Sequence, residues 1–311
     1  MRACGRRPRP AGLDPAVDYA AVDLAGEADL AGLVDGISHL FHLAGASSSR
    51  SSDLEMHRDN VVATERLLAA LPAGQLERVV HMSSTSVYGE EQELPQPVRE
   101  DVRPTPSRGY GKAKWRTEEA VWSAAARGLP VVVLRPVSVY GPGNVKLLAS
   151  AILDTAVEAF GGARTLLVHA RPIEQRLVHI DDVVRATTYL AVAAGVDGRA
   201  YNVVAEQYPT SHDVAAWLAE SFALGVELDD DPDCGPDHDE RRRLHGLMVD
   251  QGMRPHILLT PERLRFLRKA NRNNRLSVEA LLATGFRFAN TDLPGAVART
   301  VRWYRDKRWV L

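Results

Sequence analysis

The chain has 311 residues, of which 45% are hydrophobic and 25% charged, enough for one large or two modest globular domains. Its formal net charge of −2 gives no indication of binding to nucleic acid or to an anionic membrane surface. The only two cysteines, Cys4 and Cys234, lie far apart, which excludes a disulfide framework and a cysteine-based zinc site. No apolar run approaches the roughly 20 residues that a membrane span needs. We therefore expect a soluble, cytoplasmic protein with no nucleic-acid partner, no membrane and no bound metal.

In the first half of the chain, short apolar runs alternate with segments of helical periodicity. Strands are predicted at 39–45, 78–84 and 130–140, because each run is nearly continuous in apolar residues. Helices are predicted at 54–71 and 110–128, where apolar residues recur at helical spacing. Strands that are apolar on both faces and alternate with helices predict an α/β fold with a doubly wound parallel sheet.

After residue 142 the pattern becomes less regular. The predicted elements are, in order, a helix over 145–160, strands at 165–169 and 176–180, a helix over 181–195 and a strand at 200–204. A mostly helical, arginine-rich tail follows. Within it, residues 227–243 are first acidic and then basic, which predicts a solvated, mobile insertion.

Tyr110 and Lys114 stand four residues apart in the stretch GYGKAKW, at the start of a predicted helix. Residues at i and i+4 share a helix face, so Lys114, and not Lys112, lies beside Tyr110. A phenol has a pKa near ~10, and a neighbouring ammonium group lowers it by favouring the phenolate. The pair is a candidate proton-transfer unit for an alcohol or a carbonyl. The alternative is an ordinary surface helix, since this spacing is common.

Hydroxyl groups gather where the predicted strand 78–84 ends, in HMSSTSVYGEE. Ligands of doubly wound sheets bind at the carboxyl ends of the strands. A serine or threonine hydroxyl there could hold a substrate oxygen while Tyr110 exchanges its proton. The alternative is a serine-rich junction whose hydroxyls bond the local backbone.

The chain resembles the extended short-chain dehydrogenase/reductases, also called the NAD-dependent epimerase/dehydratase family. The resemblance rests on ordered motifs over about two thirds of the chain: VDL (22–24), LFHLAG (40–45), NVVATERLLAA (60–70), SSTSVYGE (83–90), Tyr110 with Lys114, LRPVSVYGPGN (134–144), LVHIDDVVRA (177–186) and YNVV (201–204). It implies a Rossmann-like dinucleotide-binding domain formed by residues 1–144 and 176–204. Residues 145–175 and 205–311 would form a smaller, mixed substrate-binding domain.

The resemblance assigns catalytic roles to three residues. Tyr110 would be the acid/base, and Lys114 would lower its pKa and hold the nicotinamide ribose. Ser84 would polarise the substrate oxygen, with Thr85 as a second candidate. Tyr110 and Lys114 would also belong to the cofactor-binding residues.

The resemblance also implies a set of cofactor-binding residues. They are Asp23 and Leu24 near the adenine, Ala44 and Gly45 beneath the cofactor, Asn60 beside it, and Pro136 and Val137 along the nicotinamide. The cofactor would be NAD or NADP. Arg6 and Arg7 lie in MRACGRRP, which resembles the family's second strand and the basic residues after it. An acidic residue there would select NAD, whereas a guanidinium suits a 2′-phosphate, which favours NADP.

Several departures from the family pattern concern the substrate. Thr85 and Ser86 stand where sugar-nucleotide 4,6-dehydratases carry an Asp-Glu pair, so elimination of water is not expected. Gln175, followed by Arg176, occupies the usual place of an arginine that binds the diphosphate. Ser138 replaces a frequent asparagine. A nucleotide sugar is one candidate substrate, with Ser84, Thr85, Ser138 and Arg176 as its contacts.

The family opens with a strand, a G-x-x-G-x-x-G turn and a helix, which hold the cofactor pyrophosphate. The sequence contains no such turn, and MRACGRRP resembles the family's second strand. The fold would lack a central strand and leave sheet edges open. Either the start lies upstream of Met1, or a truncated product binds cofactor poorly. The retained Ser84, Tyr110 and Lys114 favour the first explanation.

The resemblance predicts an NAD(P)-dependent oxidoreductase or epimerase that acts at a secondary alcohol or ketone of a small molecule. The alternative is a truncated, non-catalytic relative that binds or senses a ligand. Paired helices of such folds often form dimers, so we expect a homodimer.

Overall fold

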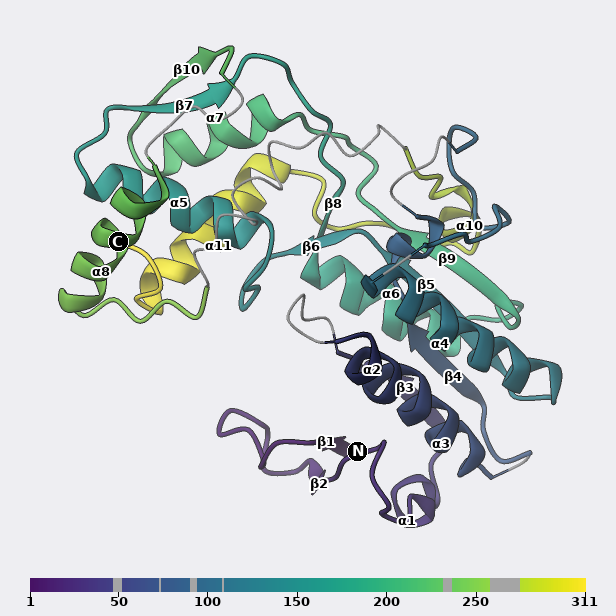
Figure 1. Cartoon of the computed structure of the whole chain (residues 1–311). Helices are drawn as coiled ribbons and strands as arrows, with labels where there is room; N and C mark the ends of the chain where they lie inside the picture. Colours follow the sequence, from purple (N-terminus) through teal and green to yellow (C-terminus); the bar gives the residue numbers. More distant parts are fainter. Residues whose placement is uncertain (47–51, 73, 90–93, 108, 232–236, 258–274) are drawn as a thin grey trace. The chain divides into compact units, whose positions relative to one another are not determined.

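A computed structural model describes residues 1–46, 52–72, 74–89, 94–107, 109–231, 237–257 and 275–311. The chain forms two compact units (Figure 1). The first unit comprises Met1–Pro136, Ala186–Val203 and Leu276–Phe286. The second unit comprises Val137–Arg185, Val204–Arg275 and Arg287–Leu311.

The first unit is built on a four-stranded parallel sheet. Its order is β3 (His39–His42), β4 (Arg78–Met82), β5 (Val131–Pro136) and β9 (Arg199–Val203). Every residue of β5 is buried, and so are all but the last of β4, because helices cover both faces of the sheet. The predicted parallel α/β fold is therefore confirmed.

One face of this sheet packs against α3 (Ala63–Ala69) and α4 (Gly109–Ala126). Val79 and Val133 of the sheet share an apolar core with Leu67 of α3 and Val121 of α4. Burying such side chains contributes about 1.5–3 kcal/mol each. This packing presents the first turns of α4 to the carboxyl end of β4.

The opposite face is covered by α6 (Ile180–Val192). Arg78 reaches the end of this helix, donating to the carbonyl oxygens of Leu190 at 2.9 Å and Ala193 at 3.1 Å. Its guanidinium also pairs with Asp197 at 2.9 Å. A cation at a helix carboxyl end satisfies carbonyl groups that have no partner within the helix. Arg78 thus joins β4 to the second helical layer.

Two further parallel strands, β1 (Arg2–Gly5) and β2 (Asp18–Ala21), form a sheet of their own. Arg2 fastens this sheet to α1 (Ala31–Val34) by donating to the carbonyl of Gly32 at 2.8 Å. Within the described residues, β1 pairs with β2 alone and β3 with β4 alone, so each has one open edge.

The predicted helix over 54–71 is one continuous helical segment with a π-helical middle. It consists of α2 (Asp53–Met56), η1 (His57–Val62) and α3. Ser52 and Glu55 form a capping box at its start, which fixes where the helix begins. Single π turns occur frequently at functional sites, and Asn60 lies in this one.

The second unit has two small parallel sheets and a helical core. β6 (Ser138–Tyr140) pairs with β8 (Leu177–His179), and β7 (Thr165–His169) pairs with β10 (Gly225–Asp229). The core helices are α5 (Leu148–Phe160), α7 (Ser211–Ser221), α8 (His238–Asp250) and α11 (Leu293–Asp306).

The boundaries of the two units differ from the expected division at 144, 176 and 204. The apolar run 130–140 is two strands, because β6 pairs with β8 of the second unit and not with the four-stranded sheet. In the tail, α10 (Glu279–Ala283) belongs to the first unit. It is preceded by Leu276, which bridges to Val98.

The expected mobile insertion at 227–243 is wrong for the residues that the structure describes, since they contribute to β10 and α8. The Asp237 side chain caps α8 by accepting from the backbone N–H groups of residues 239 and 240. Arg241, only 4% exposed, pairs with Asp154 at 2.8 Å and Glu158 at 3.1 Å on α5. This buried ion pair holds the segment in place; residues 232–236 lie outside the described residues.

Replacing Arg78 should test how far the second helical layer depends on this side chain. We expect Arg78→Met to lower the free energy of unfolding by about 3 kcal/mol, because buried carbonyl groups lose their partner. Urea denaturation measures the change. The control is Arg116→Met, which removes an exposed pair with Glu119 and should change stability by less than about 0.5 kcal/mol. Equal losses in both variants would contradict this assignment.

Candidate active site

The carboxyl end of β4 meets the first turns of α4. The helix begins at Gly109, whose φ of 59° lies in the left-handed region that glycine adopts readily. Lys114, 5% exposed, donates from Nζ to the carbonyl oxygen of Met82 at 2.8 Å. Lys112 is exposed. The helix therefore presents Lys114, and with it Tyr110, to the strand end.

The hydroxyl of Tyr110 is hydrogen-bonded to the side chain of Ser84. The Ser84 oxygen also accepts from the backbone N–H of Ser86 at 3.2 Å and from its hydroxyl at 2.8 Å. Thr85 Oγ1 instead donates to the carbonyl oxygen of Pro136 at 3.4 Å. The structure thus brings Ser84, Tyr110 and Lys114 to one place and directs Thr85 to the backbone.

Burial dominates the acid–base properties of this group. It raises the pKa of Tyr110 to about 12, although the hydrogen bond from Ser84 favours the phenolate. It lowers the pKa of Lys114 to about 8, against the opposing negative charge of Glu118. The expected lowering of the Tyr110 pKa by Lys114 is not seen in this structure. The phenol is protonated throughout the neutral range.

The loop after β3 approaches the same lysine. A Cβ atom added to Gly45 would lie 2.6 Å from Asn60 Oδ1 and 3.3 Å from Lys114 Nζ. Asn60 is 1% exposed and donates to the carbonyl oxygens of Met56 at 2.9 Å and Ala46 at 3.2 Å. Its Oδ1 atom has no hydrogen-bond partner among the described residues. A buried acceptor beside Lys114 is thus left for a ligand or a water molecule.

Charged side chains gather where the adenine end of a dinucleotide is expected. Arg6, after β1, pairs with Asp59 at 2.6 Å. Arg58 pairs with Asp59 at 2.8 Å and also with Asp23. The contact with Arg58 lowers the pKa of Asp23. Two guanidinium groups therefore share Asp59 between them.

The other expected contacts are placed as follows. The Leu24 side chain is buried in the core, so only its backbone could meet a ligand. Ala44 is exposed after β3. Pro136 ends β5 in the first unit, whereas Val137, Ser138 and Arg176 belong to the second unit and are half-buried there.

These residues fit a dinucleotide at two of its parts. Lys114 and the unpartnered oxygen of Asn60 suit the hydroxyl groups of a ribose, and Gly45 leaves the space beside them open. Asp23, Arg6 and Arg58 offer polar groups for the adenosine end. The described residues include no glycine-rich turn that would hold a pyrophosphate.

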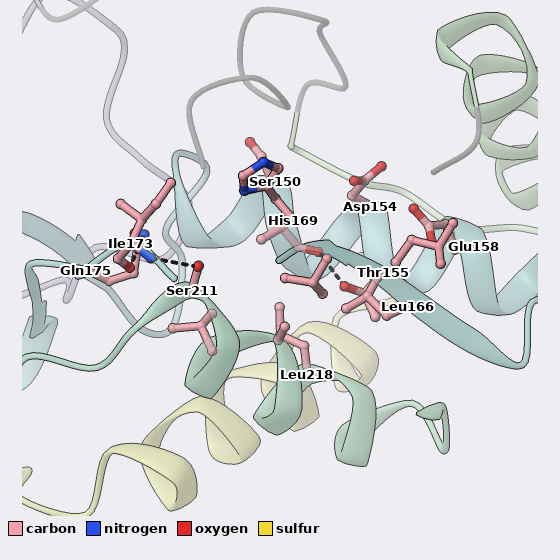
Figure 2. A pocket seen from close by; sticks show the side chains of 15 residues that line it. Ser150, Asp154, Thr155, Glu158, Leu166, His169, Ile173, Gln175, Ser211 and Leu218 are labelled. Carbon is pink, nitrogen blue, oxygen red and sulfur yellow. Dashed lines mark hydrogen bonds between the residues drawn. The ribbon is translucent and has the colours of Figure 1, made fainter. Parts of the chain in front are cut away.

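The second unit contains a cavity of about 100 Å³ between α5, β7 and α7 (Figure 2). Leu166, Ile173 and Leu218 contribute apolar walls. Ser150 also lines the cavity, is 1% exposed, and its hydroxyl has no hydrogen-bond partner among the described residues. Acidic and other polar side chains, such as Asp154, also line the cavity, so its walls are both apolar and polar.

Sequence reasoning missed Arg58 and Asp59. They directly precede Asn60 in the chain, and this position could have indicated that they lie near the cofactor. Their ion pairs with Arg6 and Asp23 could not be predicted, because those partners are distant in sequence.

The NAD dependent epimerase/dehydratase family matches residues 3–204, and the chain belongs to this family. A 4-hydroxy-2-methyl-3-oxo-4-farnesyl-3,4-dihydroquinoline-1-oxide ketoreductase from Stigmatella aurantiaca is 35% identical over 120 residues, 38% of this chain and 35% of that protein. Sterol demethylase protein B from Methylococcus capsulatus is 31% identical over 209 residues, 66% of this chain and 61% of that protein. The chain thus spans less than two thirds of the length of these two relatives.

Solved structures share the fold over nearly the whole chain. MoeE5 in complex with UDP-glucuronic acid and NAD has a TM-score of 0.70 at 25% identity, covering 98% of this chain and 90% of that chain. RMD from Pseudomonas aeruginosa complexed with NADPH has a TM-score of 0.66 at 19% identity, covering 96% and 92%. Solved structures of the same fold therefore include one with NAD bound and one with NADPH bound.

Two classes of feature are not found in the part of the chain that the structure describes. None of its helices combines the length and the apolar character required to span a bilayer. It also holds no group of three or more histidine, cysteine, aspartate or glutamate residues placed to bind a metal ion.

Gly45→Ala should show whether the open space beside Lys114 receives a cofactor. The added methyl group would press on Asn60 Oδ1, so we expect the dissociation constant for NADH or NADPH to rise at least about tenfold. Quenching of cofactor fluorescence on titration measures it. Gly32→Ala is the control, because a Cβ atom there meets nothing within 4 Å. Unchanged binding in Gly45→Ala would contradict the assignment.

Proposed function

We propose that the chain is an NAD(P)-dependent oxidoreductase or epimerase that acts at a secondary alcohol or ketone carbon. The observation that carries this proposal is the convergence of Ser84, Tyr110 and Lys114 at the carboxyl end of β4. Membership of the NAD dependent epimerase/dehydratase family supports it.

In the proposed reaction, Ser84 holds the substrate oxygen beside the phenol of Tyr110. The protonated phenol donates its proton to a carbonyl oxygen and becomes a phenolate; in the reverse direction the phenolate takes the proton of an alcohol. Bound NAD(P) would supply or accept the hydride, with Lys114, Asn60 and Gly45 at its ribose. The Lys114 ammonium favours the phenolate that forms, and this charge is present below a pKa of about 8.

The proposed substrate class is a nucleotide sugar. UDP-glucuronic acid is bound in the MoeE5 structure, and GDP-6-deoxy-D-mannose reductase from Pseudomonas aeruginosa is 28% identical over 233 residues, 71% of this chain and 76% of that protein. Ser138 and Arg176 are the proposed sugar and phosphate contacts.

Oxidoreductase and epimerase chemistry both use this trio, since an epimerase oxidises and re-reduces the same carbon. Binding or sensing without turnover is the alternative function. A homodimer in a reducing cytoplasm completes the proposal, consistent with only two cysteines in the chain.

We further propose that NADP is the preferred cofactor. Arg6 is 56% exposed at its side chain and Arg58 is 48% exposed, so both guanidinium groups can meet a ligand. A 2′-phosphate would compete with Asp59 for them, and a guanidinium binds phosphate oxygens in a bidentate manner.

Tyr110→Phe tests the catalytic proposal. Removing the hydroxyl should reduce turnover of a keto sugar nucleotide by at least about a hundredfold, because general acid catalysis contributes a factor of this order. NAD(P)H absorbance follows turnover, and fluorescence quenching shows that cofactor still binds. Lys112→Met, at an exposed position of the same helix, should keep wild-type rates. Cofactor binding without turnover in the wild type would support the sensing alternative.

Arg6→Ala tests the cofactor preference. The KM for NADPH should rise about tenfold, whereas the KM for NADH should change by less than about twofold. Arg99→Ala is a matched control, since Arg99 is also 56% exposed and pairs with an acidic residue, Glu279. Equal effects of Arg6→Ala on both cofactors would refute the NADP proposal.

A further inference from the structure

Three consecutive residues at the end of β4 are each held by α4. Lys114 donates to the carbonyl of Met82 at 2.8 Å, Tyr110 is hydrogen-bonded to Ser84, and Glu118 accepts from the Ser83 hydroxyl. The three helix residues lie at i, i+4 and i+8 and so share one face of α4. Two of these contacts belong to the proposed catalytic group, and the third has no assigned role.

Glu118 is fully buried, with a relative exposure of 0%. Arg135 of β5 donates to its two carboxylate oxygens, from Nε at 3.1 Å and from Nη2 at 2.7 Å. A bidentate pair of this kind fixes the orientation of both planar groups. The carboxylate is therefore held rigidly while it accepts the hydrogen bond from Ser83.

Arg135 is itself held on its far side. Its Nη1 atom donates to the carbonyl oxygen of Glu100 at 3.1 Å and to the hydroxyl of Tyr88 at 2.9 Å. The Tyr88 hydroxyl donates in turn to Asn202 Oδ1 at 2.8 Å. The network thus runs from β9 through β5 to Glu118 and ends one residue before Ser84.

We propose that Glu118 is a positioning residue for the reaction: it fixes the strand end that carries Ser84 and keeps Lys114 in its charged form. This inference rests on the proposed function of the same site. Glu118 acts through Ser83 and Lys114.

The charges around Lys114 support this role. His42 of β3 and His81 of β4 also face the lysine; burial lowers the pKa of His42 to about 4 and that of His81 well below its ordinary value. Both are therefore neutral near pH 7, and so is Tyr110, whose pKa is raised to about 12. Glu118 remains the group that opposes the effect of burial on Lys114.

Replacing Glu118 should lower the pKa of Lys114. Glu118→Gln removes a negative charge and leaves the positive charge of Arg135 without its partner, and both changes disfavour the Lys114 ammonium. The pKa of Lys114 should fall below about 8, the wild-type value. The alkaline limit of activity should move to lower pH with it.

The experiment combines two measurements on Glu118→Gln. An NMR titration of ¹³C-labelled lysine side chains, assigned with Lys114→Met, follows Lys114 in the protein without substrate. Steady-state kinetics should show kcat reduced about tenfold at pH 7 and KM within about twofold. An unchanged Lys114 pKa with an unchanged alkaline limit would overturn the proposal, even if the variant were less stable.

Tyr88→Phe is the matched control, because it removes a hydrogen bond from the same network on the side away from Lys114 and Ser83. It should lower stability and leave the Lys114 titration and the pH profile in place. If wild-type protein shows no turnover, the proposed function fails, whereas the titration of Lys114 still decides the role of Glu118.

Ser83→Ala covers the case in which Glu118→Gln does not fold. It keeps the ion pair and removes only the link between Glu118 and the strand end. We expect kcat to fall about tenfold in Ser83→Ala and less than about twofold in Tyr88→Phe. Equal losses in the two variants would refute the positioning role.

Discussion

The buried ion pair between Glu118 and Arg135 is the interaction on which the site depends. Both side chains are almost fully enclosed, so neither charge can be left alone without a penalty of about 3–5 kcal/mol. The pair therefore allows one register of α4 against β4 and β5. That register sets Tyr110 beside Ser84 and Lys114 beside Met82, and the apolar core of α3 and α4 then closes around it.

The sequence predicted β4 and β5 well, because these strands are buried on both faces and read as continuous apolar runs. It failed where burial is partial. β10 was missed because four of its five residues are exposed, and its short alternation of Val226, Glu227, Leu228 and Asp229 runs into an acidic stretch. The run at 130–140 looked like one strand, since no sequence pattern reveals that residues 138–140 pair in a different sheet. Tertiary contacts determine which strands pair with one another.

Some features of the candidate site could likewise be predicted from the sequence, and others could not. Tyr110 and Lys114 could be proposed from their spacing, whereas the choice of Ser84 among the neighbouring hydroxyl groups came from the resemblance to the family. The structure brings the three together. The direction in which the pKa of Tyr110 shifts could not be predicted, because burial has the largest effect on it and a local sequence motif does not show how deeply a side chain is buried. Glu118 is visible four residues after Lys114, but its meaning depends on Arg135, 17 residues further along the chain.

One structural feature links folding to ligand binding. Among the described strands, β3 is bonded to β4 alone, so its local opening requires less free energy than that of β4 or β5, which are bonded on both sides. Ala44 and Gly45 lie just beyond the end of this strand, which places the floor of the proposed cofactor site beside an edge strand of the sheet. A molecule held there would tighten β3 as it bound, and amide exchange along β3 would slow in proportion to occupancy.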